Sequence, residues 1–281
     1  MSLPVYVSQN GALIPPQLAS VSIFNPAIYG AYGVYESMQV QHGTIFALKE
    51  HLHRLDRSAR LLELPLPADL NMIEKWCHEV ITANDAAEST LRLTVMGAEA
   101  EGSSTAYLWP QRPTIFPSRY YEEGVSVATF EGQRFMPEAK SLNTLVSFLA
   151  RRRAWAAGAH EGLLWHDDLV TEGSSSNVFA VQDDVLVTPP AHQVLSGVTR
   201  DLVIGLARSD GIRVSERPLP FATMTEWSEC FITSTSRHVM PVSFIDQQPV
   251  GKAHVGPLTR RLMTLFESCF HNAVECLERV P

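Results

Sequence analysis

In the N-terminal part of the chain, apolar residues recur with two different periods, which predicts both strands and helices. The stretch "VYVSQNGALI" alternates and turns at Asn10-Gly11, as β-hairpins do. From Leu48 to Leu62 the apolar residues instead recur every three or four positions, so an amphipathic helix is predicted that ends before Pro65. The same reasoning predicts two strands around His42-Gly43, a helix over 71–85, and strands over 90–97 and 105–110.

The C-terminal part shows strand and helix patterns again, after a segment that has neither. Residues 111–124, "QRPTIFPSRYYEEG", are rich in Pro and Tyr without periodicity, and we interpret them as the linker between two domains, 1–115 and 116–281. The elements predicted beyond the linker are a strand over 125–130, a helix over 141–158, a meander over 161–190, a helix over 197–211, two strands over 230–246 and a helix over 258–280.

Composition and charge argue against several functional classes. The 281 residues are 45% apolar and 19% charged, as in a globular protein of one large or two ordinary domains. The net charge of −8 argues against sequence-independent nucleic-acid binding, which needs a basic surface. No apolar run is long enough to span a membrane and no signal peptide is recognised, so a cytoplasmic location is expected. The four cysteines lack ligand-like spacing, which predicts reduced thiols and no metal site.

Two residues suggest chemistry. The stretch "VTEGSSSNVF", residues 170–179, places Glu172 and several small polar residues between apolar, strand-like runs. Lys140 lies at a predicted strand-to-helix junction, whereas the other three lysines have ordinary surface interpretations. Partial burial of an ammonium group removes hydration and lowers its pKa, so the free amine becomes a nucleophile suited to a Schiff base.

Three further features would suit a phosphate group. Ser196-Gly197 precedes a predicted helix, so the amides of Val198 and Thr199 are unsatisfied donors at the positive end of the helix dipole, with ordinary capping as the alternative. Residues 233–237, "TSTSR", form a hydroxyl-rich loop, or simply a polar turn. Arg54 borders the apolar stripe of the first helix and would point inward as a phosphate clamp, unless it is a surface arginine.

Together these residues match the needs of a phosphorylated aromatic aldehyde cofactor: an amine, anion donors, and a carboxylate for a pyridine nitrogen. In this interpretation Glu172 keeps the ring nitrogen protonated, so that the ring draws electrons from the substrate carbanion. Gly173 and Ser174–Ser176 let the chain pass close to the cofactor. The alternative is that Glu172 is a strand-end carboxylate paired with an arginine.

The stretch "AKSLNTLVSFLARRRAWAAGAHEGLLWHDDLVTEGSSSNVFAV" closely resembles the class-IV, fold-type-IV pyridoxal-phosphate aminotransferases, which include D-amino-acid and branched-chain aminotransferases and aminodeoxychorismate lyase. The stretches "YGAYGVYESMQVQHGTIFALKEHLHRLDRSA", "TPPAHQVLSGVTR" and "FITSTSRHVMPV" resemble their N-terminal hairpin and helix and their two phosphate loops. The resemblance covers nearly the whole chain. It implies an α+β fold with a smaller N-terminal α/β domain and a larger C-terminal domain with a β-barrel-like core, and a homodimer that completes each site.

The resemblance also implies roles for individual residues. Lys140 matches the lysine that holds pyridoxal 5′-phosphate as a Schiff base, Glu172 matches the partner of the pyridine nitrogen, and Arg54 matches the arginine on the phosphate. Tyr35 and Arg92 match residues of the substrate pocket. The implied reaction is a ping-pong transfer of an amino group from an amino acid to a 2-oxo acid. The other implied cofactor-binding residues are Val198, Thr199, Ser234, Thr235, Leu195 and Asn177.

The substrate end departs from the family pattern. D-alanine transaminases carry Arg-x-His after the strand that ends here at Gly97, but this chain has the acidic "GAEAEGSS" instead. That loop would repel a carboxylate and favour a cationic or neutral amine, or it is a solvated turn. Branched-chain enzymes carry Tyr-x-Arg where this chain has "TLR", so Arg92 fits as a carboxylate ligand or as a structural residue. Arg134 and the partner subunit are the other candidate carboxylate traps.

Three functions follow from these observations. The first is a transaminase acting on D-amino or branched-chain amino acids. The second is aminodeoxychorismate lyase, which eliminates pyruvate, and the third is a non-enzymatic protein that kept the fold. The serine-rich run and "KSLN" favour the first over the second, and the presence of both Lys140 and Glu172 argues against the third.

Overall fold

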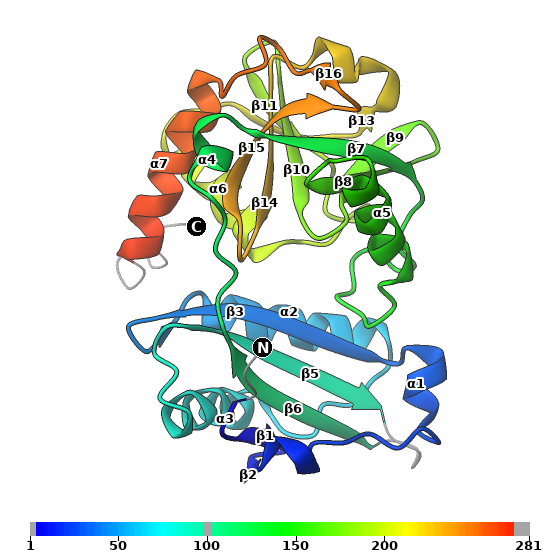
Figure 1. The fold of residues 1–281 in the computed structure, drawn as a ribbon, viewed down its shortest axis with the longest axis vertical. Coiled ribbons are helices and arrows are strands. Elements are labelled where there is room, and N and C mark those ends of the chain that lie inside the picture. The colour runs from blue at the N-terminus through cyan, green and yellow to red at the C-terminus, as the bar shows by residue number, and fades with distance from the viewer. Residues whose placement is uncertain (1–3, 98–102, 273–281) are drawn as a thin grey trace. The chain divides into compact units, whose positions relative to one another are not determined.

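The structure is a computed structural model that describes residues 4–97 and 103–272 (Figure 1). Its contacts divide the chain into two compact units: Met1–Thr114 with Ala139–Asn143, and Ile115–Glu138 with Thr144–Pro281. The sequence assigns Lys140 to the C-terminal domain, whereas its segment groups with the first unit. The reason is that Ser141 pairs with Val34 in an isolated antiparallel bridge.

The first unit is a six-stranded sheet with helices packed on it, in the strand order β2-β1-β6-β5-β3-β4. The predicted hairpins, both helices and the two later strands are confirmed within a few residues. The elements are β1 (Val7–Gln9), β2 (Ala12–Ile14), η1 (Pro16–Leu18), α1 (Pro26–Gly30), β3 (Gly33–Gln41), β4 (Thr44–Ile45), α2 (Leu48–Leu61), α3 (Leu70–Ala83), β5 (Ser89–Gly97) and β6 (Ser104–Gln111).

The core of the first unit follows from the two periods with which apolar residues recur, one in the strands and one in the helices. Alternate residues of β3 are buried, among them Val34 and Met38, and the apolar stripe of α2, including Leu52 and Leu55, packs against this strand. Glu36 occupies the same buried phase of β3. The pattern therefore places a carboxylate among core positions, where it requires partners.

The second unit is built on a ten-stranded sheet in which six strands close a ring. The neighbours run β10-β14-β15-β7-β8-β9, and β9 pairs back to β10 through Glu172 and Asn177. This closure confirms the β-barrel-like core. The elements are α4 (Arg119–Glu122), β7 (Val125–Glu131), α5 (Leu145–Ala156), β8 (Glu161–His166), β9 (Leu169–Gly173), β10 (Asn177–Gln182), β11 (Val185–Thr188), α6 (Val198–Ser209), β12 (Val214–Glu216), β13 (Leu219–Pro220), η2 (Phe221–Glu226), β14 (Glu229–Ser234), β15 (His238–Ile245), β16 (Gln248–Pro249) and α7 (Pro257–His271).

Some local expectations change. The helix predicted from residue 141 begins at Leu145, because the residues before it contact β3.

Cys77 and Cys230 are buried free thiols, and burial raises the pKa of Cys77 to about 12. The expectation of a reduced thiol is wrong for Cys269, which is disulfide-bonded. Within the described ranges, no helix is both long and apolar enough to cross a membrane.

Candidate active site

Lys140 is held over an aromatic ring in the first unit. Its Nζ lies 4.7 Å from the centroid of the Tyr35 ring. The Lys140 N–H donates to Ser58 Oγ at 3.0 Å, and the Lys140 carbonyl accepts from the Tyr35 N–H at 3.0 Å. The lysine is partly buried, whereas the other three lysines of the chain, Lys49, Lys75 and Lys252, are all exposed. These hydrogen bonds fix the backbone of Lys140, the one lysine of the chain that is partly buried.

A second cation also lies close to the Tyr35 ring. The Arg92 guanidinium lies 5.3 Å from the same ring centroid, and Arg92 on β5 is paired in register with Ser37 on β3. Cations are attracted to the face of an aromatic ring, so Tyr35 links the two positive groups. The substrate-pocket residues predicted from the resemblance, Tyr35 and Arg92, are thus brought together with Lys140.

Arg54 belongs to a buried ion-pair group whose other members, Glu36 and His51, were not among the predicted site residues. Its Nε donates to Glu36 Oε1 at 2.8 Å and its Nη2 to Glu36 Oε2 at 2.6 Å. His51 Nδ1 lies 2.8 Å from Glu36 Oε2. Arg54 is only 4% exposed, so the surface alternative for this residue is wrong. A bidentate pair of this kind fixes the direction of the guanidinium plane.

The charges in this group perturb one another. Burial raises the pKa of Glu36, but the Arg54 guanidinium and the hydrogen bonds from Arg54 and His51 outweigh it and hold the pKa well below its ordinary 4.5. Burial lowers the pKa of His51 below 6.5, and the charges of Arg54 and Lys140 lower it further. A signal for this group was present in the sequence: Glu36 falls on the buried phase of a strand, and His51 and Arg54 fall on the buried side of a helix.

Glu172 lies in the second unit and is bound by an arginine. Arg134 Nε donates to Glu172 Oε1 at 2.8 Å, and the Leu195 N–H donates to Glu172 Oε2 at 3.3 Å. Arg134 also donates to the Pro137 carbonyl. The structure therefore contains the arginine pairing that the structural alternative for Glu172 predicts. Because its guanidinium holds these two groups, Arg134 is poorly suited to trap a substrate carboxylate.

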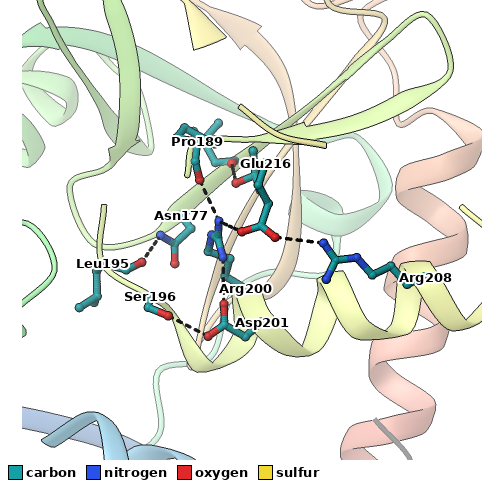
Figure 2. A network of polar contacts seen from close by, with 10 residues as sticks. Asn177, Pro189, Leu195, Ser196, Arg200, Asp201, Arg208 and Glu216 are labelled. Carbon is teal, nitrogen blue, oxygen red and sulfur yellow. Dashed lines mark hydrogen bonds and ion pairs between the residues drawn. The ribbon is translucent and has the colours of Figure 1, made fainter. Parts of the chain in front are cut away.

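Asn177 connects Glu172 to the start of α6. Its Nδ2 donates to the Leu195 carbonyl at 2.7 Å, as Figure 2 shows. A Cβ atom added to Gly197, the residue before α6, would overlap Asn177 Oδ1. Val198 and Thr199 are buried in the first turn, and no side chain of the described residues caps it. The N-terminal end of α6 is therefore fixed by Asn177 and by the close packing around Gly197, where no side chain would fit.

A further network anchors the first turn of α6. Arg200 is 2% exposed and reaches Asp201 Oδ1 and Glu216 Oε2, both at 2.9 Å, and the Pro189 carbonyl at 2.8 Å (Figure 2). Ser196 Oγ donates to Asp201 Oδ2 at 2.9 Å. These contacts tie the helix to the preceding loop and to β12, so they support the position of the helix terminus and are structural.

The second predicted phosphate loop follows β14. Ser234 ends this strand and its Oγ accepts from the Arg237 N–H at 3.2 Å, which closes the turn that contains Thr235. The neighbouring Thr233 lies opposite Asn177 in the β10–β14 ladder. Thr233 Oγ1 and Ser176 Oγ are buried without a hydrogen-bond partner among the described residues. Buried hydroxyls of this kind are usually satisfied, so these two donors fit a bound polar ligand.

The predicted site residues therefore form two groups, one in each unit. Lys140, Tyr35, Arg92 and Arg54 belong to the first unit. The second unit contains Glu172 with the remaining predicted cofactor residues, which are Leu195, Asn177, Val198, Thr199, Ser234 and Thr235. The acidic stretch that contains Glu99 and Glu101 lies outside the described residues.

Comparison with known proteins identifies the family. The family model described as Amino-transferase class IV matches residues 33–245. A putative branched-chain-amino-acid aminotransferase of Methanocaldococcus jannaschii is 34% identical, over 92% of this chain and 94% of its own. A D-alanine aminotransferase of Bacillus licheniformis is 31% identical, over 92% of this chain and 95% of its own.

Solved structures agree with these matches. The branched-chain amino acid aminotransferase of Escherichia coli has a TM-score of 0.88 at 26% identity, covering 96% of this chain and 95% of that one. The branched-chain enzyme of T.th., crystallised with pyridoxamine 5′-phosphate, has a TM-score of 0.89 at 29% identity, covering 96% and 94%. This chain therefore belongs to the class-IV aminotransferases, enzymes of fold type IV that use pyridoxal 5′-phosphate to transfer amino groups.

Proposed function

We propose that this enzyme transfers the amino group of a D-amino acid or a branched-chain amino acid to a 2-oxo acid by a ping-pong mechanism. The observation that carries the proposal is the position of Lys140, the one partly buried lysine of the chain, with its amine over the Tyr35 ring. Both substrate classes are named among relatives that match over nearly the whole chain.

In this proposal Lys140 has two roles. Its Nζ would hold pyridoxal 5′-phosphate covalently. Its amine would also act as the general base that takes the Cα proton of the donor and as the general acid that delivers a proton to the cofactor carbon. When bound, the cofactor supplies a ring that withdraws electrons from the carbanion left by that proton.

The other predicted residues would hold the cofactor. Glu172, fixed by Arg134 and the Leu195 amide, would partner the ring nitrogen, and Arg54 would bind the phosphate. The hydroxyls of Ser176 and Thr233, which have no hydrogen-bond partner in the described part of the chain, fit such a ligand. The further phosphate contacts proposed are Val198, Thr199, Ser234 and Thr235, with Leu195 packing on the ring and Asn177 supporting the Glu172 region.

A half-reaction screen tests the substrate proposal. The cofactor-loaded protein is mixed with single D-amino acids, L-amino acids or simple amines, and the absorbance of the Lys140 Schiff base is followed. We expect loss of this absorbance with amino acids of the D or branched-chain type, and recovery when a 2-oxo acid is added. Reaction with simple amines alone would contradict the proposed substrate class. Release of pyruvate from aminodeoxychorismate without an acceptor would instead identify the lyase; the relatives named above are aminotransferases and do not favour it.

The proposed enzyme works as a homodimer in the cytoplasm, and α5 supports the dimer. This helix buries its small residues Ser147, Ala150 and Ala154 against the unit. Its larger apolar residues point outward: Leu145 is 65% exposed and Trp155 is 62% exposed. Large apolar side chains that are exposed together on one helix are typical of a protein–protein contact.

A further inference from the structure

Glu161 is a buried carboxylate that the predicted cofactor set does not include. It is the first residue of β8 in the second unit and is 1% exposed. Removing a carboxylate from water is costly unless several donors replace the lost hydration. The donors that surround Glu161 therefore show which parts of the unit it holds together.

Its two oxygens bind donors from separate segments. Oε1 accepts from the Ser174 hydroxyl and, at 3.2 Å, from the Gly162 N–H. Oε2 accepts from Ser175 Oγ at 2.9 Å and pairs with Arg237 Nη2 at 2.7 Å. Arg237 Nη1 also donates to Ser175 Oγ at 3.0 Å, so the carboxylate, the hydroxyl and the guanidinium form a closed ring of contacts.

These donors belong to the two segments that flank the proposed cofactor residues. Ser174 and Ser175 follow Glu172 at the end of β9. Arg237 belongs to the turn of Ser234 and Thr235, and its N–H donates to Ser234 Oγ at 3.2 Å. The serine-rich run is thus explained in part by Glu161, which receives two of its three hydroxyls.

The contacts of Arg237 also determine what its turn can present to an anion. The guanidinium is paired with Glu161 and lies 5.3 Å from the centroid of the Phe116 ring. Its side chain is only 12% exposed. The cation therefore anchors the turn, and the hydroxyls and amides of Ser234 and Thr235 are the groups left to meet a phosphate.

We propose that Glu161 is a positioning residue for phosphate binding, which fixes the turn of Ser234 and Thr235 against the serine-rich run through Arg237. This inference rests on the proposed function, because the phosphate is that of the cofactor. Glu161 contacts neither the cofactor nor the substrate in this proposal. Its removal should weaken recognition of the phosphate more than recognition of the ring and aldehyde.

The test compares pyridoxal 5′-phosphate with pyridoxal, which lacks the phosphate. Apoprotein carrying Glu161→Gln is titrated with each compound, and binding is followed by absorbance. Glutamine keeps one acceptor oxygen but carries no charge, so the ion pair with Arg237 is lost and one of the surrounding donors faces an NH2 group. We expect the Kd for pyridoxal 5′-phosphate to rise by about 10-fold to 100-fold, as when a residue that supports a metal ligand is lost, with the Kd for pyridoxal unchanged.

Glu229→Gln is the matched control. Glu229 is another buried carboxylate of the same unit, but it binds the Leu258 N–H at 3.1 Å and the Thr259 N–H at 2.7 Å at the start of α7. Its substitution should lower stability and leave the ratio of the two dissociation constants unchanged. The control separates the loss of a buried charge from the loss of a phosphate-positioning contact.

Each remaining outcome is decisive. Equal weakening for both compounds, or no change for pyridoxal 5′-phosphate, would overturn the role of Glu161. Failure of the wild-type protein to bind pyridoxal 5′-phosphate would contradict the proposed function itself. If Glu161→Gln does not fold, Arg237→Met, which leaves Glu161 its serine and amide donors, must show the same selective loss; an unchanged ratio in that variant overturns the inference.

Discussion

Glu36 shows how a single residue can constrain the candidate site. It is completely buried on β3, and its carboxylate is the shared partner of His51 and Arg54. Without Glu36, Arg54 would be a buried cation that has lost its bidentate carboxylate partner, and without Arg54, Glu36 would lose the cation that neutralises it. Each lowers the cost of burying the other, so the orientation of the proposed phosphate-binding arginine depends on a residue that would not contact the phosphate.

The charge states of this group predict how stability depends on pH. The pKa of His51 is below its ordinary 6.5 in the folded protein, so the unfolded chain binds a proton that the folded chain does not. The free energy of unfolding should therefore fall as the pH is lowered from 7 through 6, by up to about 1.4 kcal/mol per pH unit for one proton. Chemical unfolding at several pH values measures this slope.

His51→Gln should reduce the slope between pH 7 and 5, because the titrating group is gone. His78→Gln, which removes an exposed histidine of α3, is the control for the loss of a histidine side chain. Equal slopes in the His51 variant and the wild type would contradict the assignment. Below pH 4.5 a further loss is expected from Glu36, whose pKa is also depressed.

Glu36→Gln tests the ion pair directly. The substitution leaves the Arg54 cation buried beside an uncharged group, and breaking one side of a buried pair costs about 3–5 kcal/mol of unfolding free energy. Urea unfolding at pH 7 measures the loss. A variant within the error of the wild type would show that Arg54 does not depend on this carboxylate.

At the scale of single elements, the N-terminus of α6 is tightly packed, and the residue before it has no room for a side chain. Gly197 precedes the helix with an extended backbone that other residues also adopt, so its small size is what matters there. A side chain at this position would overlap Asn177, which itself holds the Leu195 carbonyl. The proposed phosphate amides of α6 therefore depend on close contact between a loop glycine and a strand residue.

Gly197→Ala should displace Asn177 or the first turn of α6. We expect a loss of about 1–3 kcal/mol in unfolding free energy, as for other overpacked positions, together with weaker binding of pyridoxal 5′-phosphate. Thermal unfolding and cofactor titration measure the two effects. Gly30→Ala is the control, because the nearest atom to a Cβ there is 3.8 Å away. Unchanged cofactor affinity in the Gly197 variant would argue against a phosphate site at this helix.

Much of the element structure could be predicted from the sequence because it follows from local periods. The alternation around Asn10-Gly11 and the stripe of α2 produced the hairpin and the helix where they were expected. The segment of Lys140 could not be placed in this way. Its bridge to Val34 joins residues more than a hundred positions apart in sequence, and no local pattern of apolar residues indicates such a contact.

The same limit applies to the candidate site. Lys140 and Glu172 could be selected because their residue types are unusual in their local setting. Arg134 as the partner of Glu172, and Glu161 as the partner of Arg237, follow only from how strands are paired in the barrel. Glu36 lies between these cases, because its place on the buried phase of β3 was visible in the sequence.

At the scale of the whole molecule, the outward apolar face of α5 predicts self-association. Sedimentation velocity should show a dimer for the wild type. Phe148→Glu places a charge within this face, where Phe148 is 50% exposed, and should shift the population to monomer. Met72→Glu is the matched control, since Met72 is a 42% exposed apolar residue on α3. A monomeric wild type, or a Phe148 variant that remains dimeric, would contradict this assignment.

The identity of the covalently bound lysine is the central claim for the whole enzyme, and mass mapping tests it most directly. The cofactor-loaded protein is reduced with borohydride and digested, and the labelled peptide is identified. We predict that the label lies on Lys140 and that Lys140→Ala carries none. A label on Lys49, Lys75 or Lys252, or no label in the wild type, would contradict the proposed function.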